Sequence, residues 1–134
     1  MNYLKGRIIS FKYAITGILD VLKNETNLKI HLTAAIITLY AGVYFGISKT
    51  EWCLVILCIV AVLCAETFNT AIEHLTDLVS PDIHPLAKKT KDAAAGAVLW
   101  MAIGALLVGL IIFFPKILIA VSYTHLTLPT IYSV

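Results

Sequence analysis

The sequence predicts an all-α membrane protein that consists of an N-terminal amphipathic surface helix and three transmembrane helices. Hydrophobic residues make up 60% of the 134 residues, charged residues make up 13%, and the mean hydropathy is +0.91. Soluble domains are closer to one half apolar and one quarter charged. The length fits a single domain. The net charge of +2 gives no indication of a nucleic-acid partner.

Residues 3–23 predict the surface helix. Their apolar side chains recur at steps of three and four residues, which places them on one face of a helix, and the basic residues lie elsewhere. The apolar stripe comprises Leu4, Ile8, Phe11, Ile15, Ile18 and Leu22. A basic amphipathic helix of this kind lies along a membrane surface. Packing of the stripe on other helices of a bundle is the alternative.

Three apolar stretches predict transmembrane helices at about residues 28–47, 52–79 and 92–114. Lys29 and His31 stand at the start of the first stretch, where we expect both side chains to reach the headgroups. Pro81 follows the second helix closely and predicts its end. The third helix is expected to end at Pro115.

Residues 1–117 form the predicted domain, and residues 118–134 are interpreted as a non-native tail. The final SYTHLTLPTIYSV has no helical or strand periodicity and directly follows a natural-looking chain end. Because such a segment resembles translated adapter sequence, we exclude it, with His125, from the fold prediction.

The distribution of basic residues predicts the orientation in the membrane. With the N-terminus in the cytoplasm, eight of the Lys and Arg residues lie on the cytoplasmic side and only Lys49 and Lys116 lie outside. Basic residues accumulate on the cytoplasmic side of membrane proteins. The sequence therefore predicts a multi-pass protein with its polar face on the cytoplasmic side, and the expected location is the inner (plasma) membrane.

A polar face begins where the second apolar stretch ends. Residues 52–65 cover only ~21 Å at 1.5 Å per residue, whereas the hydrocarbon core is roughly 30 Å thick, so Glu66 is expected near the cytoplasmic boundary. Continued as a helix, the face comprises Glu66, Asn69, Thr70, Glu73 and Asp77. An ionisable group within a membrane span is costly, and this makes Glu66 a candidate functional residue.

This face, with Glu25 and Lys91 at the same membrane surface, contains the parts that phosphoryl transfer needs. Carboxylates and amides are oxygen ligands for Mg²⁺, a carboxylate can act as a base for a hydroxyl, and a lysine can bind phosphate. The sequence contains no Walker motif and no glycine-rich kinase loop. The depth of Glu66 suits a substrate that stays in the membrane.

Four segments carry a resemblance to a known family. They are KNETNLKIH, AETFNTAIEHLTDLVSP, HPLAKKTKDAAAGAV and GLIIFFPKI. Together these segments resemble the small trimeric membrane kinases of bacteria, the diacylglycerol kinase/undecaprenol kinase family. The resemblance spans about residues 3–117, and the endings TAIEH and KDAAAGAV are similar to the Gram-positive branch.

The resemblance implies a role for each candidate residue. Glu66 would be the catalytic general base that takes the proton from the lipid hydroxyl. Glu25 and Glu73 would ligate Mg²⁺ ions that bridge the phosphates of ATP, and Asn69 would hold the geometry of the site.

The resemblance also implies how the nucleotide and the subunits are arranged. Lys91 would contact the transferred phosphate, and Asp92 would lie beside the nucleotide. The family forms homotrimers that share active sites between neighbouring subunits beneath a surface helix. Members of the Gram-positive branch use ATP to phosphorylate undecaprenol, so undecaprenol is the first expectation for the lipid and diacylglycerol is the second.

Each candidate also has a purely structural interpretation. Glu66 and Asn69 can hydrogen-bond between helices, Glu25 can offset a helix dipole, and Lys91 and Asp92 can pair at the end of a span. Solvated positions on a protruding helix are the alternative for Glu73 and Asp77, and His74 and His84 are expected to be solvated or capping residues. The rival function is a non-catalytic membrane subunit whose polar face binds a partner or conducts ions.

Overall fold

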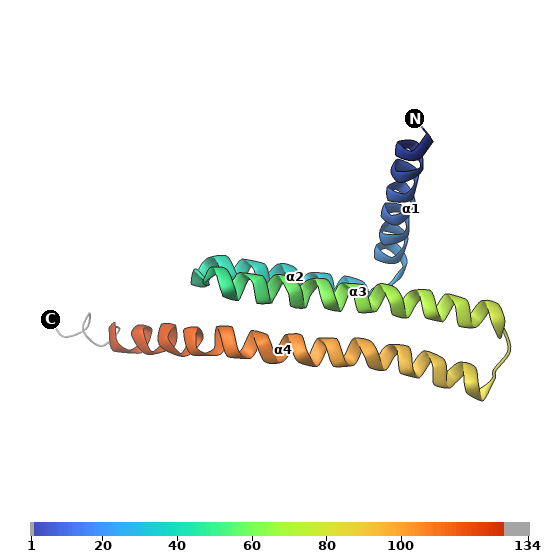
Figure 1. Cartoon of the computed structure of the whole chain (residues 1–134). Coiled ribbons are helices and arrows are strands. Elements are labelled where there is room, and N and C mark those ends of the chain that lie inside the picture. The colour runs from blue at the N-terminus through green and yellow to red at the C-terminus, as the bar shows by residue number, and fades with distance from the viewer. Residues whose placement is uncertain (1, 128–134) are drawn as a thin grey trace.

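The computed structural model describes residues 2–127, and this part of the chain consists of four α-helices joined by short turns (Figure 1). The helices are α1 (Asn2–Asn24), α2 (Thr26–Phe45), α3 (Lys49–Val79) and α4 (Pro85–Thr127). No strand occurs within residues 2–127. The structure thus confirms the predicted all-α fold class.

Helices α2, α3 and α4 lie side by side, and α3 packs against both of the others. Figure 1 shows that α2 and α4 each run antiparallel to α3, so the start of α2, the end of α3 and the start of α4 lie toward the same end of the bundle. Each of the three helices is long and apolar enough to cross a membrane. Most of their large apolar side chains are exposed in the isolated chain, as expected for surfaces that face lipid or other helices.

Helix α1 stands away from the three packed helices (Figure 1). All of its side chains from Tyr3 to Asp20 are exposed. The predicted apolar stripe therefore remains uncovered, with Phe11 72% exposed. Such a helix can bury its stripe in a membrane surface, which is the arrangement that the sequence predicts.

The turn between α2 and α3 is defined by glycine and by a capping box. Gly46 ends α2 with φ of 60°, a backbone conformation that favours glycine. The Ser48 side chain accepts a hydrogen bond from the backbone N–H of Glu51, and the Glu51 carboxylate accepts one from the backbone N–H of Ser48. A Cβ atom at Gly42 would lie only 2.8 Å from the Trp52 ring, so glycine permits this close approach of α2 to α3.

Helix α4 is longer than the span predicted at residues 92–114. It begins at Pro85, where the missing N–H costs nothing, and the His84 ring accepts a hydrogen bond from the backbone N–H of Leu86. The helix also continues through Pro115 to Thr127 instead of ending at the proline. Pro115 removes one backbone N–H from the helix, but the residues on both sides of it are apolar and remain helical. The prediction of a non-native tail over 118–134 lies partly outside the described residues.

Candidate active site

The polar face of α3 is turned into the bundle. Glu66, Asn69 and Thr70 are buried in the isolated chain, and the Glu66 side chain is only 5% exposed. The Thr70 hydroxyl donates to the Glu66 backbone carbonyl at 3.1 Å, so this hydroxyl is satisfied within the helix. Burying a carboxylate costs several kcal/mol unless it has a partner. The buried Glu66 carboxylate is therefore expected to have a polar partner.

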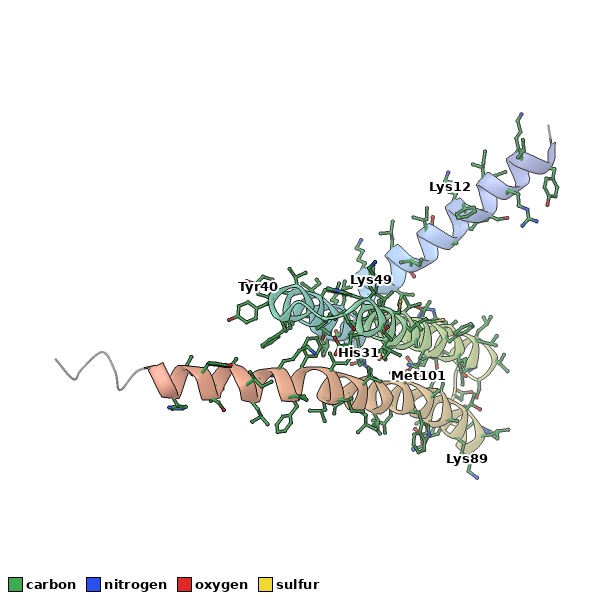
Figure 2. The ribbon with its side chains drawn as sticks, turned by 60° about the vertical axis from the view of Figure 1, so that its left-hand side comes forward. Lys12, His31, Tyr40, Lys49, Lys89 and Met101 are labelled. Atoms are coloured by element: carbon green, nitrogen blue, oxygen red, sulfur yellow. The ribbon has the colours of Figure 1, made fainter. Side chains whose placement is uncertain are left out.

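The partner of Glu66 is a histidine on the neighbouring helix. Nε2 of His31 on α2 lies 3.1 Å from Oε1 of Glu66 on α3. Figure 2 places His31 among the packed helices, whereas Lys12 on α1 lies far from them. The sequence predicts a position near the headgroups for His31, and the structure adds that its ring meets the buried acid. Lys29 turns back toward the surface and donates to the Lys23 carbonyl.

Asn69 and Glu73 are connected one helical turn apart. The Asn69 side-chain N–H donates to Oε1 of Glu73 at 3.0 Å. The Asn69 Oδ1 atom is buried and has no hydrogen-bond partner in the described part of the chain. Buried polar atoms without a partner are uncommon in native structures and call for an explanation, such as a ligand that the isolated chain lacks.

The third pair joins α3 to α4. Nζ of Lys91 lies 2.5 Å from Oδ1 of Asp77, and these side chains are 36% and 61% exposed. Asp92 pairs with Lys88 at 2.6 Å along α4. Exposed ion pairs contribute little to stability, so both lysines can exchange their partners for another anion.

Glu25 lies at the first residue before α2, between α1 and α2. It makes no capping hydrogen bond through its side chain, and it is half-buried. Within residues 2–127, no three His, Cys, Asp or Glu side chains come together closely enough to hold a metal ion. A single chain thus pairs Glu66 with His31, Glu73 with Asn69 and Asp77 with Lys91, but it does not gather a complete metal site around Glu25 and Glu73.

An apolar cavity of about 340 Å³ lies between α2, α3 and α4. Its lining is apolar apart from His31, Thr38 and Cys58. Because His31 both lines this cavity and meets Glu66, the cavity extends to within one side chain of the buried acid. The apolar cavity and the buried carboxylate thus lie close together.

The fold and the site together define a small helical membrane protein with an acidic site built into its spans. The family described as prokaryotic diacylglycerol kinase matches residues 12–113. The chain therefore belongs to this family of membrane lipid kinases, for which ATP is the phosphate donor.

Individual relatives agree with this assignment. The chain is 43% identical to the undecaprenol kinase of Bacillus subtilis (strain 168) over 116 residues, which cover 87% of this chain and 94% of that protein. It is 34% identical over 112 residues to the diacylglycerol kinase of Synechocystis sp., covering 83% of this chain and 64% of the relative. It is 30% identical over 91 residues to the diacylglycerol kinase of Haemophilus influenzae, covering 68% and 77%. The predicted family and the predicted class of enzyme, a lipid kinase, are confirmed.

Proposed function

We propose that the chain transfers the γ-phosphate of ATP to the terminal hydroxyl of undecaprenol and thereby makes undecaprenyl phosphate. The observation that carries this proposal is Glu66, a carboxylate buried at the end of an apolar span beside an apolar cavity. The choice of lipid is supported by the 43% identity to an undecaprenol kinase over 94% of that protein's length. Diacylglycerol is the second candidate, because other relatives are diacylglycerol kinases.

Glu66 is the catalytic base in this proposal. It takes the proton of the lipid hydroxyl as the hydroxyl oxygen bonds to the γ-phosphorus, the bond from that phosphorus to the bridging oxygen breaks, and ADP leaves. The Oε1 atom of Glu66 lies 3.1 Å from Nε2 of His31, and the second carboxylate oxygen, Oε2, is assigned to meet the hydroxyl. The apolar cavity beside His31 can take part of the hydrocarbon of the lipid.

The nucleotide is assigned to the end of the bundle that contains the turn between α3 and α4. Lys91 contacts the transferred phosphate, Asp92 lies beside the nucleotide, and Asn69 orients the site. Lys91 is available for this role because its present partner, Asp77, is largely exposed. Replacement of Asp77 by a phosphate would preserve the charge balance of the lysine.

The donor atoms present fit Mg²⁺, which prefers oxygen ligands. Oε1 of Glu73 accepts the hydrogen bond from Asn69, and the other carboxylate oxygen takes no part in that bond. Oδ1 of Asn69, which has no hydrogen-bond partner within residues 2–127, belongs to the same face of α3. Glu73 and Glu25 would hold the ions. When bound, Mg²⁺ neutralises charge on the phosphates of ATP.

A homotrimer with shared active sites would supply what the single chain lacks. The apolar faces of α2, α3 and α4 are largely uncovered, and within residues 2–127 no three potential ligands from His, Cys, Asp or Glu come together. The excess of basic residues near α1 and the start of α4 supports an active site on the cytoplasmic side of the inner membrane. Because the family match ends at residue 113, residues 118–134 are assigned outside the catalytic domain.

The proposal is tested with purified protein in phosphatidylcholine nanodiscs that contain undecaprenol, diacylglycerol or neither lipid. Labelled phosphate should pass from γ-labelled ATP to undecaprenol fastest and to diacylglycerol more slowly. A faster reaction with diacylglycerol would replace the proposed substrate with the second candidate. Absence of labelled lipid in all samples would contradict the kinase assignment and favour the rival function of a partner-binding membrane subunit.

A further inference from the structure

His31 is the feature of the site that the candidate roles above leave unused. Its ring comes from α2, lies 3.1 Å from the Glu66 carboxylate on α3, and is 27% exposed, whereas the Glu66 side chain is 5% exposed. The two residues are brought together only by the antiparallel packing of α2 on α3. The contact is therefore a tertiary feature and not a local consequence of helix formation.

A buried carboxylate has to remain ionised in order to take a proton from an alcohol. A buried carboxylate loses the hydrogen bonds that water would give it, and a polar group within a few ångströms can replace part of them. Within residues 2–127, no lysine or arginine pairs with Glu66: Lys29 is bonded to the Lys23 carbonyl, and Lys91 is paired with Asp77. His31 is the charged or ionisable group that the structure places against this carboxylate.

The contact also relates the carboxylate to the apolar cavity. Nε2 of His31 lies against Oε1 of Glu66, and this contact does not involve Oε2. Because the His31 ring lines the apolar cavity, the carboxylate is held at the edge of the space that is suited to the lipid hydrocarbon. A freely rotating glutamate would present the same oxygen in productive geometry for only part of the time.

We propose that His31 is a positioning residue for the phosphoryl transfer: its ring, with Nε2 at 3.1 Å from Oε1, holds the Glu66 carboxylate in place and aims Oε2 at the lipid hydroxyl. This inference rests on the proposed function of Glu66 as the base. It predicts that the loss of His31 lowers kcat and leaves the KM for ATP unchanged, because nucleotide binding is assigned to other residues.

Two substitutions of similar size separate a donor role from a packing role. In His31→Gln the amide N–H can take the place of Nε2–H, whereas His31→Met has a similar length and no donor. We expect His31→Met to lower kcat roughly tenfold or more, since general-base catalysis contributes about 10²–10⁴-fold, and His31→Gln to retain most of the rate. Equal rates for His31→Met and the wild type, or equal losses in both variants, would overturn the proposal.

A double substitution tests whether His31 acts through Glu66. In a Glu66→Gln background, His31→Met should cause no further loss of the residual rate, because a residue that acts through another has no separate effect once that residue is gone. Independent, multiplicative losses would contradict the proposal. An inactive wild type would instead contradict the proposed function itself, so the two failures are distinguishable.

A spectroscopic measurement keeps the test valid if His31 variants do not fold. The chain with ¹⁵N-labelled histidine contains His31, His74, His84 and His125. Replacement of Glu66 by Gln should move the ring nitrogen resonances of His31 and leave those of His74 and His84 in place. Unchanged His31 resonances would show that the ring does not sense the carboxylate, and this would overturn the inference.

Discussion

The two ends of the α2–α3–α4 bundle differ in how completely their polar groups are paired. At the end that contains the α2–α3 turn, which we call the closed end, Glu51 uses both carboxylate oxygens: Oε2 accepts from the Ser48 backbone N–H and Oε1 accepts from Nζ of Lys116, each at 2.8 Å. Apolar side chains pack beside this network, and the buried ones are Ile47, Val55 and Ile112.

At the opposite end, which we call the polar end, the pairing is incomplete. Oδ1 of Asn69 is buried and has no hydrogen-bond partner within residues 2–127, and the buried Glu66 carboxylate lies 3.1 Å from Nε2 of His31. The closed end follows the usual rule that buried polar groups are satisfied. The polar end departs from it, and departures of this kind concentrate at functional sites. We therefore expect substitutions at the closed end to change mainly stability and substitutions at the polar end to change mainly catalysis.

The largest effect is expected from two matched carboxylate substitutions on α3. Glu66→Gln removes the base and should reduce lipid phosphorylation by roughly 10²–10⁴-fold. Glu51→Gln at the closed end should leave the rate near that of the wild type and lower the thermal midpoint, because the Lys116 pair loses its charge. Steady-state rates and thermal unfolding of both variants check this. A large loss of rate in Glu51→Gln would contradict the division between the two ends.

A matched pair of lysines on α4 tests the nucleotide assignment. Removing one donor to a reacting anion costs about 10²-fold, so Lys91→Met should reduce kcat/KM for ATP by roughly that amount. Lys89→Met removes the same charge from an exposed position two residues away, which Figure 2 shows on the outer side of α4, and should change the rate little. Equal effects of both substitutions would contradict a specific contact between Lys91 and the phosphate, because any nearby positive charge would then have the same effect.

A substitution at the closed end should lower stability. Gly42→Val places a side chain where a Cβ would meet the Trp52 ring at 2.8 Å, and overpacking costs about 1–3 kcal/mol. Gly104→Val on α4 is the control, because no side chain lies within 4 Å of a Cβ at this position. Thermal unfolding should show a loss for Gly42→Val alone. Equal stability of the two variants would mean that the α2–α3 approach at Gly42 is not tight.

The smallest effect is expected from truncation. Removal of residues 118–134 leaves Lys116, and therefore its ion pair with Glu51, in place. The truncated chain should phosphorylate lipid at the wild-type rate and keep its thermal midpoint. A loss of activity would show that these residues belong to the catalytic domain.

Much of this architecture could be predicted from the sequence because it depends on local periodicity. The apolar stripe of α1, the three long apolar stretches and the face that carries Glu66 and Asn69 all follow from helical spacing. The end of α3 before Pro81 also follows from local chemistry, since proline restricts the residue before it. The continuation of α4 through Pro115 could not be predicted in this way, because the cost of a proline within a helix depends on its surroundings.

The contact between His31 and Glu66 joins two different helices, so helical periodicity alone does not predict it. A signal was nevertheless present. His31 stands 17 residues before Ser48 and Glu66 stands 18 residues after it, so two antiparallel helices joined there bring both residues to one level. Counting outward from the predicted turn would have identified the partner of the buried acid.

The most direct test of the account is a single-turnover measurement of phosphate transfer. Wild type and Glu66→Gln would be loaded with γ-labelled ATP in nanodiscs that contain undecaprenol, and labelled lipid and bound nucleotide would be followed in time. We expect both proteins to bind ATP equally and only the wild type to transfer the label rapidly. Transfer by Glu66→Gln at the wild-type rate would contradict the assignment of this buried carboxylate as the base.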